Sequence, residues 1–72
     1  MDRRIRAPRP RYAEMRQAAG YSQMKAAELL GFSARALAGY ELGTNQPTAG
    51  RIVRMAEVYG CTTDALLGLE KE

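Results

Sequence analysis

The sequence contains no histidine and no tryptophan, and it has a single cysteine, Cys61. One cysteine cannot form an internal disulfide bond, which excludes a disulfide-stabilised framework and favours a reducing, cytoplasmic location. Histidine and cysteine also supply most zinc ligands and the residues of Ser-His and Cys-His catalysis. We therefore expect neither an enzyme nor a metal site, and no cofactor or small-molecule ligand.

Long hydrophobic runs are also lacking. No stretch approaches the roughly 20 apolar residues that span a bilayer, and no apolar signal region follows the arginine-rich beginning. We therefore expect no membrane association. The 72 residues, 46% of them hydrophobic and 26% charged, are enough for one small folded domain. A domain of this size buries only about 60% of its unfolded surface, so its stability is expected to be low.

The positive charge is concentrated at the start of the chain. Residues 1–16 contain six arginines and two acidic residues, whereas residues 17–72 contain five basic and six acidic residues. This asymmetry divides the chain into an Arg/Pro-rich arm at 1–9, a globular domain at 10–68 and a short tail at 69–72. A basic segment of this kind is either a solubilising tail or an arm that follows a phosphate backbone. The arginines concerned are Arg3, Arg4, Arg6, Arg9 and Arg11.

Capping residues and glycines divide the globular part into five helices. Their pattern predicts helices over about 10–19, 23–30, 34–42, 49–59 and 63–67, each joined to the next by a short connection. The N-caps are expected at Ser22, Ser33, Thr48 and Thr62. Nothing in the sequence indicates a strand. The predicted fold class is all-α, a compact five-helix bundle.

The run from Ser22 to Glu41 has the organisation of a helix-turn-helix. Ala27 is small enough for two helices to cross closely, and Gly31 permits the positive φ of a tight turn. Leu37 then supplies an apolar anchor for the second helix. This organisation is typical of a DNA-binding helix-turn-helix.

Two charged residues occupy positions that face the predicted core. Arg16 lies on the same helical stripe as Tyr12 and Met15, and Glu41 follows the inward Leu37 and Tyr40. An unpaired buried charge is very unfavourable, so each of the two requires a partner.

From about residue 11 to residue 67 the chain resembles the phage repressor and Cro family, the lambda-repressor-like or xenobiotic-response-element type of helix-turn-helix. The motifs that carry the resemblance are Met15-Arg16, Gly20-Tyr21-Ser22-Gln23, Ala27-Glu28-Leu29-Leu30-Gly31-Phe32-Ser33, Tyr40-Glu41-x-Gly43, Pro47-Thr48, Met55-Ala56, Gly60-Cys61-Thr62 and Asp64-Ala65-Leu66-Leu67. The resemblance implies a five-helix fold with the helix-turn-helix at helices two and three.

The resemblance also implies roles for particular residues. It implies that Gln23 contacts the DNA backbone or an adjacent base, and that Arg16 and Glu41 form an ion pair between the first and third helices. The residues implied to face the major groove are Ser33, Ala34, Arg35, Ala38 and Gly39, and those implied to touch phosphates are Thr44 and Asn45. Members of this family commonly bind paired half-sites as dimers. The surplus leucines Leu66 and Leu67 are therefore either ordinary surface residues or part of a homodimer interface, and we favour the interface.

The sequence departs from the family pattern where DNA would be read. Short residues stand at Ala34 and Gly39 in place of long polar ones, and Thr44 and Asn45 replace basic residues. Arg35 is the one strong donor that remains on this face. For Gly39, a closer approach to the DNA backbone is one interpretation.

Two functions therefore stay open. One is a small sequence-specific regulator of transcription, a repressor that binds double-stranded DNA. The other is a protein-interaction adaptor or antitoxin-like partner that keeps the fold with weak base readout. Gln23, Arg35 and the basic arm favour the regulator. The residues that favour the adaptor are Ala34, Gly39, Thr44 and Asn45.

Overall fold

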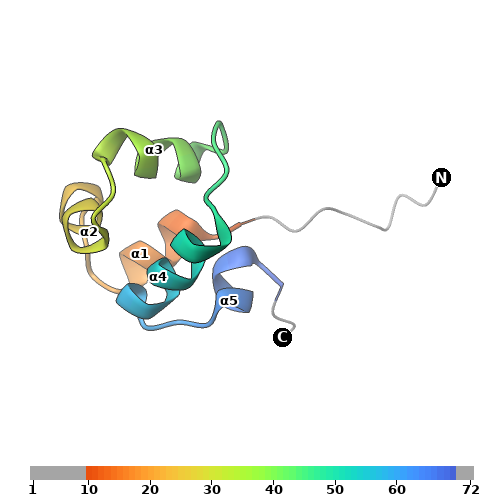
Figure 1. Ribbon diagram of the computed structural model, residues 1–72. Helices are drawn as coiled ribbons and strands as arrows, with labels where there is room; N and C mark the ends of the chain where they lie inside the picture. The colour runs from red at the N-terminus through yellow and green to blue at the C-terminus, as the bar shows by residue number, and fades with distance from the viewer. Residues whose placement is uncertain (1–9, 70–72) are drawn as a thin grey trace.

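A computed structural model describes residues 10–69 of the chain as a bundle of five α-helices (Figure 1). The helices are α1 (Tyr12–Ala18), α2 (Gln23–Leu30), α3 (Ala34–Leu42), α4 (Ala49–Tyr59) and α5 (Thr63–Leu67). The described part of the chain contains no strand, and the predicted all-α class is confirmed. None of the helices within residues 10–69 has the length and apolar character needed to cross a bilayer.

Four of the helices begin and end as the sequence predicts. At the start of α2, α3, α4 and α5 a serine or threonine oxygen accepts a hydrogen bond from the backbone N–H three residues later. The capping residues are Ser22, Ser33, Thr48 and Thr62. Between α2 and α3 the chain turns at Gly31, whose φ of 78° is strained for any residue with a side chain. This turn places α3 next to α2.

Helix α1 begins later than predicted. The expected start was near residue 10, but Arg11 has φ −118° and ψ 41° and lies outside the helix. Its backbone N–H donates a hydrogen bond of 2.8 Å to the carbonyl of Leu66 at the end of α5. The chain is therefore held against α5 before α1 begins, which delays the first helical turn by about two residues.

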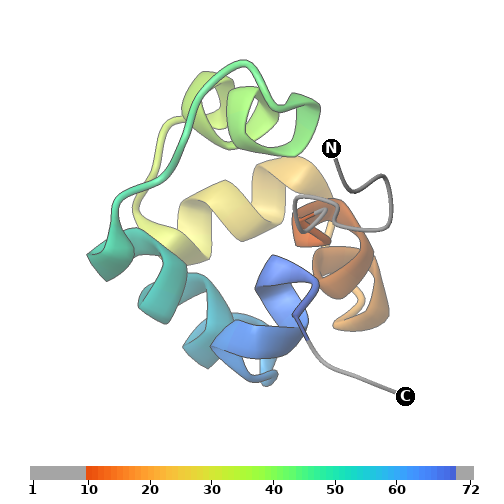
Figure 2. The ribbon, with the colours of Figure 1, turned by 90° about the vertical axis from the view of Figure 1, so that its right-hand side faces the viewer.

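The hydrophobic core lies between α2 and α3 on one side and α1, α4 and α5 on the other (Figures 1 and 2). Leu37 of α3, Met55 of α4 and Leu66 of α5 are the largest fully buried side chains. The small residues Ala26 and Ala27 of α2 are also buried, as expected where helices cross closely. This packing holds α3 at one edge of the bundle with its outer side free.

The expectation that Leu66 lies at a dimer interface is wrong. Its side chain is 0% exposed and packs inside the core of the single chain, whereas Leu67 is only partly buried. Successive residues of an α-helix point roughly 100° apart, so Leu66 and Leu67 cannot share one direction. The side chain of Leu66 is buried because α5 packs against α1 and α4.

Candidate nucleic-acid interface

The outer side of α3 is the surface that the structure leaves available at the edge of the bundle. Leu37 and Tyr40 point into the core, while Arg35 and Gly39 lie one turn apart on the opposite side. Ala34 and Arg35 are exposed, and Ala38 is partly buried. Both views show no other helix over this side (Figures 1 and 2). The part of this side that Ala34 and Arg35 occupy is therefore open to solvent at the edge of the bundle.

Arg35 is the one cation within residues 10–69 whose head group has no partner among those residues. The other five cationic side chains in this range are Arg11, Arg16, Lys25, Arg51 and Arg54. Each of them pairs with a carboxylate, a carbonyl or an aromatic side chain. Within this part of the chain, all the donors of the Arg35 guanidinium are therefore left for another ligand.

Two of these cations, Arg51 and Arg54, are not available for an external ligand because they bind groups within the domain. Arg51 donates to the hydroxyl of Tyr40 at 2.7 Å and lies over the ring of Phe32, with 4.4 Å from its guanidinium carbon to the ring centroid. Arg54 donates to the carbonyl of Leu30 at 3.1 Å, at the end of α2. The contacts of both arginines therefore connect α4 to the helix-turn-helix.

The predicted ion pair between Arg16 and Glu41 is present and joins α1 to α3. Arg16 Nε donates to Glu41 Oε2 at 2.7 Å, and Arg16 Nη2 donates to Oε1 at 3.1 Å. The two side chains are 11% and 7% exposed. The hydrogen bond that Arg16 donates to Glu41 raises the pKa of Arg16 further above its already high value. Arg16 therefore stays charged at any ordinary pH.

The same network includes two contacts that the sequence did not indicate. Arg16 Nη1 donates to the carbonyl of Tyr21 at 2.8 Å, and Gln23 Nε2 donates to Glu41 Oε1 at 2.9 Å. The chain between α1 and α2 and the first residue of α2 are thus tied to α3. The carboxylate of Glu41 fixes the orientation of the Gln23 amide, whose second N–H is left for another acceptor.

Gly39 has a role that the sequence did not suggest. It lies on the outer side of α3 but is buried, because the loop after α3 folds back over it. The backbone N–H groups of Gly43, Thr44 and Asn45 all donate to the Gly39 carbonyl, at 2.9, 3.0 and 3.3 Å. The interpretation that Gly39 permits closer approach to DNA is therefore replaced: the residue makes room for the loop.

Of the remaining predicted contact residues, one caps α3, three are exposed, and four lie outside the described range. The Ser33 oxygen caps α3 by accepting from the Ala36 N–H at 3.0 Å. Thr44 and Asn45 are exposed at the tip of the loop. Arg11 is exposed and paired with Glu14 at 2.8 Å, and this contact lowers the pKa of Glu14. The other arm residues, Arg3, Arg4, Arg6 and Arg9, lie outside the described residues.

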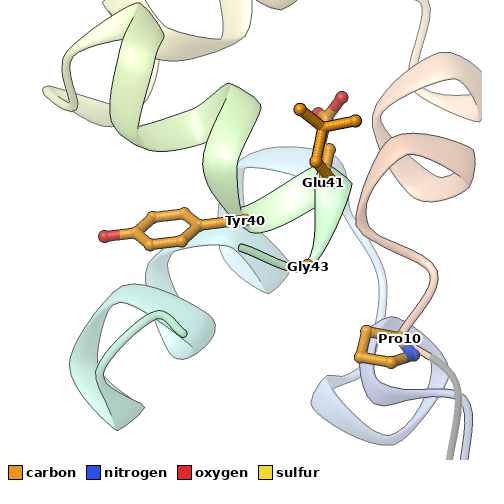
Figure 3. A pocket seen from close by; sticks show the side chains of 5 residues that line it. Pro10, Tyr40, Glu41 and Gly43 are labelled. Atoms are coloured by element: carbon orange, nitrogen blue, oxygen red, sulfur yellow. The ribbon is translucent and has the colours of Figure 1, made fainter. Parts of the chain in front are cut away.

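A pocket of about 320 Å³ lies beside the end of α3 (Figure 3). It is lined by Pro10, Tyr40, Glu41, Leu42 and Gly43. Its one ionised side chain, Glu41, is already bound by Arg16 and Gln23. Residues 10–69 also hold no cluster of three side chains able to bind a metal ion. We therefore assign no ligand to the pocket.

The fold and the free face of α3 define a helix-turn-helix domain of the type that inserts a helix into a DNA groove. The family model described as "Helix-turn-helix" matches residues 13–66. The chain therefore belongs to the Cro/C1-type helix-turn-helix family, which is not a family of enzymes.

Three curated relatives come from Bacillus subtilis (strain 168). The chain is 36% identical over 62 residues to the HTH-type transcriptional regulator AnsR, covering 86% of this chain and 53% of AnsR. It is 36% identical over 61 residues to the HTH-type transcriptional regulator ImmR, covering 85% of this chain and 48% of ImmR. It is 32% identical over 57 residues to the SPbeta prophage-derived uncharacterized HTH-type transcriptional regulator YonR, covering 79% of this chain and 53% of YonR. The chain thus spans about half the length of these relatives.

A solved structure has a similar fold. The crystal structure of a transcriptional regulator from Listeria innocua superposes with a TM-score of 0.69 at 26% sequence identity. The match covers 89% of this chain and 64% of the Listeria chain.

Proposed function

We propose that this chain is a sequence-specific DNA-binding regulator of transcription, a repressor that places α3 in the major groove. The observation that carries the proposal is Arg35, the cation on the outer side of α3 that has no partner among residues 10–69. An arginine in the major groove donates two hydrogen bonds to guanine O6 and N7. The names of the relatives as transcriptional regulators support the same conclusion.

The neighbouring residues have weaker roles in this proposal. The Ala34 and Ala38 methyl groups suit contact with the thymine methyl group. Gln23 lies at the beginning of α2, where the free N–H of its amide can donate to a backbone phosphate. Thr44, exposed on the loop after α3, is a second phosphate contact. Ser33 acts indirectly by capping α3.

The test is selection of binding sites from random double-stranded DNA with the wild type, Arg35→Ala and Arg35→Lys. We expect the wild type to enrich a defined site and both variants to lose preference at one guanine per half-site. Arg35→Lys is the matched control, because it keeps the positive charge but cannot make the bidentate contact. Unchanged preference in both variants would show that Arg35 does not read a base.

The basic arm supplies phosphate contacts in this proposal. Residues 10–69 carry six cationic and five anionic side chains, so the domain alone attracts DNA weakly. Each phosphate contact adds roughly 0.9 to the slope of log affinity against log salt. A version starting at Pro10 is therefore expected to have a slope smaller by about three. Equal slopes for the two proteins would remove the arm from the proposal.

Two copies are proposed to bind one site, with recognition helices about 34 Å apart, one turn of DNA. Leu67 remains a candidate contact because it is only partly buried. Footprinting on the selected site tests this part of the proposal. A symmetrical site of two half-sites is expected, and protection of a single half-site would contradict pairing.

The adaptor is the second candidate, and Leu42 favours it. This leucine lies on α3 and is 79% exposed, as an apolar contact for a protein partner would be. The same selection experiment separates the two functions. If the wild type enriches no sequence even at low salt, the adaptor replaces the regulator as the proposed function.

A further inference from the structure

The outer side of α3 has a gap in its row of side chains, and a residue from elsewhere in the chain fills it. Position 39 follows Arg35 by one helical turn on this side, but it is glycine. A Cβ atom added there would collide with Asn45 Nδ2 and would lie 3.2 Å from Asn45 Cγ. The Asn45 amide therefore occupies the space that a side chain at position 39 would occupy.

The loop is held in this position by backbone hydrogen bonds. The Gly39 carbonyl accepts from three successive N–H groups, those of Gly43, Thr44 and Asn45. The Thr44 hydroxyl also donates to this carbonyl at 3.3 Å. The loop therefore does not depend on the Asn45 side chain for its position, and the amide of Asn45 lies on a fixed backbone.

The Asn45 amide is free to bind a ligand. Asn45 is exposed, and its side chain makes no hydrogen bond with any residue in the range 10–69. This amide lies over position 39, one helical turn from Arg35, and has no partner among residues 10–69. It therefore presents one donor and one acceptor group on the outer side of α3.

From this geometry we propose that Asn45 acts as the base-reading side chain that α3 lacks at position 39. The inference rests on the proposed DNA-binding function and gives Asn45 a different role from a phosphate contact. In the major groove, an asparagine amide pairs with adenine by accepting from N6 and donating to N7. The expected site therefore contains an adenine close to the guanine read by Arg35.

The experiment compares the wild type with three single variants in site selection and in binding to the selected site. Asn45→Ala removes the amide. Asn45→Asp keeps its size but removes the donor. Gly39→Ala leaves Asn45 intact but adds a Cβ where the amide now lies, so the amide has to move. Thermal unfolding of each variant checks that the fold is kept.

All three variants are expected to lose discrimination at the same base pair, by roughly 5- to 150-fold, with the rest of the site unchanged. Gly39→Ala is expected to do so without a lower Tm, because alanine favours a helix more than glycine does. The double variant Gly39→Ala/Asn45→Ala is expected to lose no more than Asn45→Ala alone, since both changes remove one contact. Thr44→Ala is the control, and it is expected to weaken all sequences equally.

Two results would overturn the inference while leaving the proposed function in place. In the first, Asn45→Ala selects the same site with the same discrimination as the wild type. In the second, it weakens binding to all sequences equally and reduces the salt slope, as the loss of a phosphate contact does. If the wild type selects no site at all, the proposed function fails, and the inference fails with it.

Discussion

Replacing Glu41 with leucine tests how much the buried ion pair contributes to stability. The substitution leaves Arg16 only 11% exposed, with the Tyr21 carbonyl as its remaining partner among the contacts described. Two unit charges about 4 Å apart attract by about 4 kcal/mol at an effective dielectric constant near 20. Breaking one side of a buried pair costs about 3–5 kcal/mol, which agrees with that value. A domain of 72 residues has a total stability of roughly 4–11 kcal/mol.

The assay is urea unfolding followed by circular dichroism for the wild type, Glu41→Leu, Arg16→Met and the double variant. Each single change is expected to lower the urea midpoint by more than about 1 M or to unfold the domain. The double variant is expected to be more stable than Glu41→Leu, because it leaves no unpaired charge in the core. A loss below about 1 kcal/mol in Glu41→Leu would refute the reasoning, since that is the value of an exposed pair.

Two further predictions concern stability. The Tyr59 hydroxyl is buried without a hydrogen-bond partner among residues 10–69, so Tyr59→Phe is expected to leave stability unchanged or raise it by about 1–2 kcal/mol. Burial raises the pKa of Tyr59 to about 12, above its unfolded value near 10, so the wild type should lose up to about 2–3 kcal/mol as pH rises between these values. An equal alkaline loss in Tyr59→Phe would contradict this. Arg54→Ala removes the hydrogen bond to the Leu30 carbonyl and is expected to lower Tm by about 4–8 °C, whereas an unchanged Tm would show that the contact contributes nothing.

The sequence predicted the helices well because their ends depend on local chemistry. Ser22 and Ser33 can cap only the residues that follow them, and Gly31 can take a positive φ in any context. The inward stripe of each helix likewise follows from its period. Arg16 and Glu41 could be recognised as inward charges for the same reason, and the family resemblance supplied the pairing.

The parts that the sequence did not predict depend on contacts between distant segments. Helical period places Gly39 on the outer side of α3, but it does not show that the following loop covers that side. The complete burial of Leu66 by α5 could not be predicted from the sequence, because an excess of leucines fits either a core or an interface. The late start of α1 also depends on a contact between distant segments, the hydrogen bond from the Arg11 backbone N–H to the Leu66 carbonyl.

That hydrogen bond also determines how the domain can be connected to other proteins. It joins the Arg11 backbone nitrogen, just before α1, to the Leu66 carbonyl oxygen at the end of α5, at a distance of 2.8 Å. Residues 10 and 69 therefore belong to one corner of the fold. The same corner lies beside the end of α3, because Pro10 lines a pocket with Leu42 and Gly43. A coiled coil or reporter joined directly at residue 10 or residue 69 would therefore lie near the end of α3. Two domains joined in this way would be linked at the same corner whichever of the two positions is used.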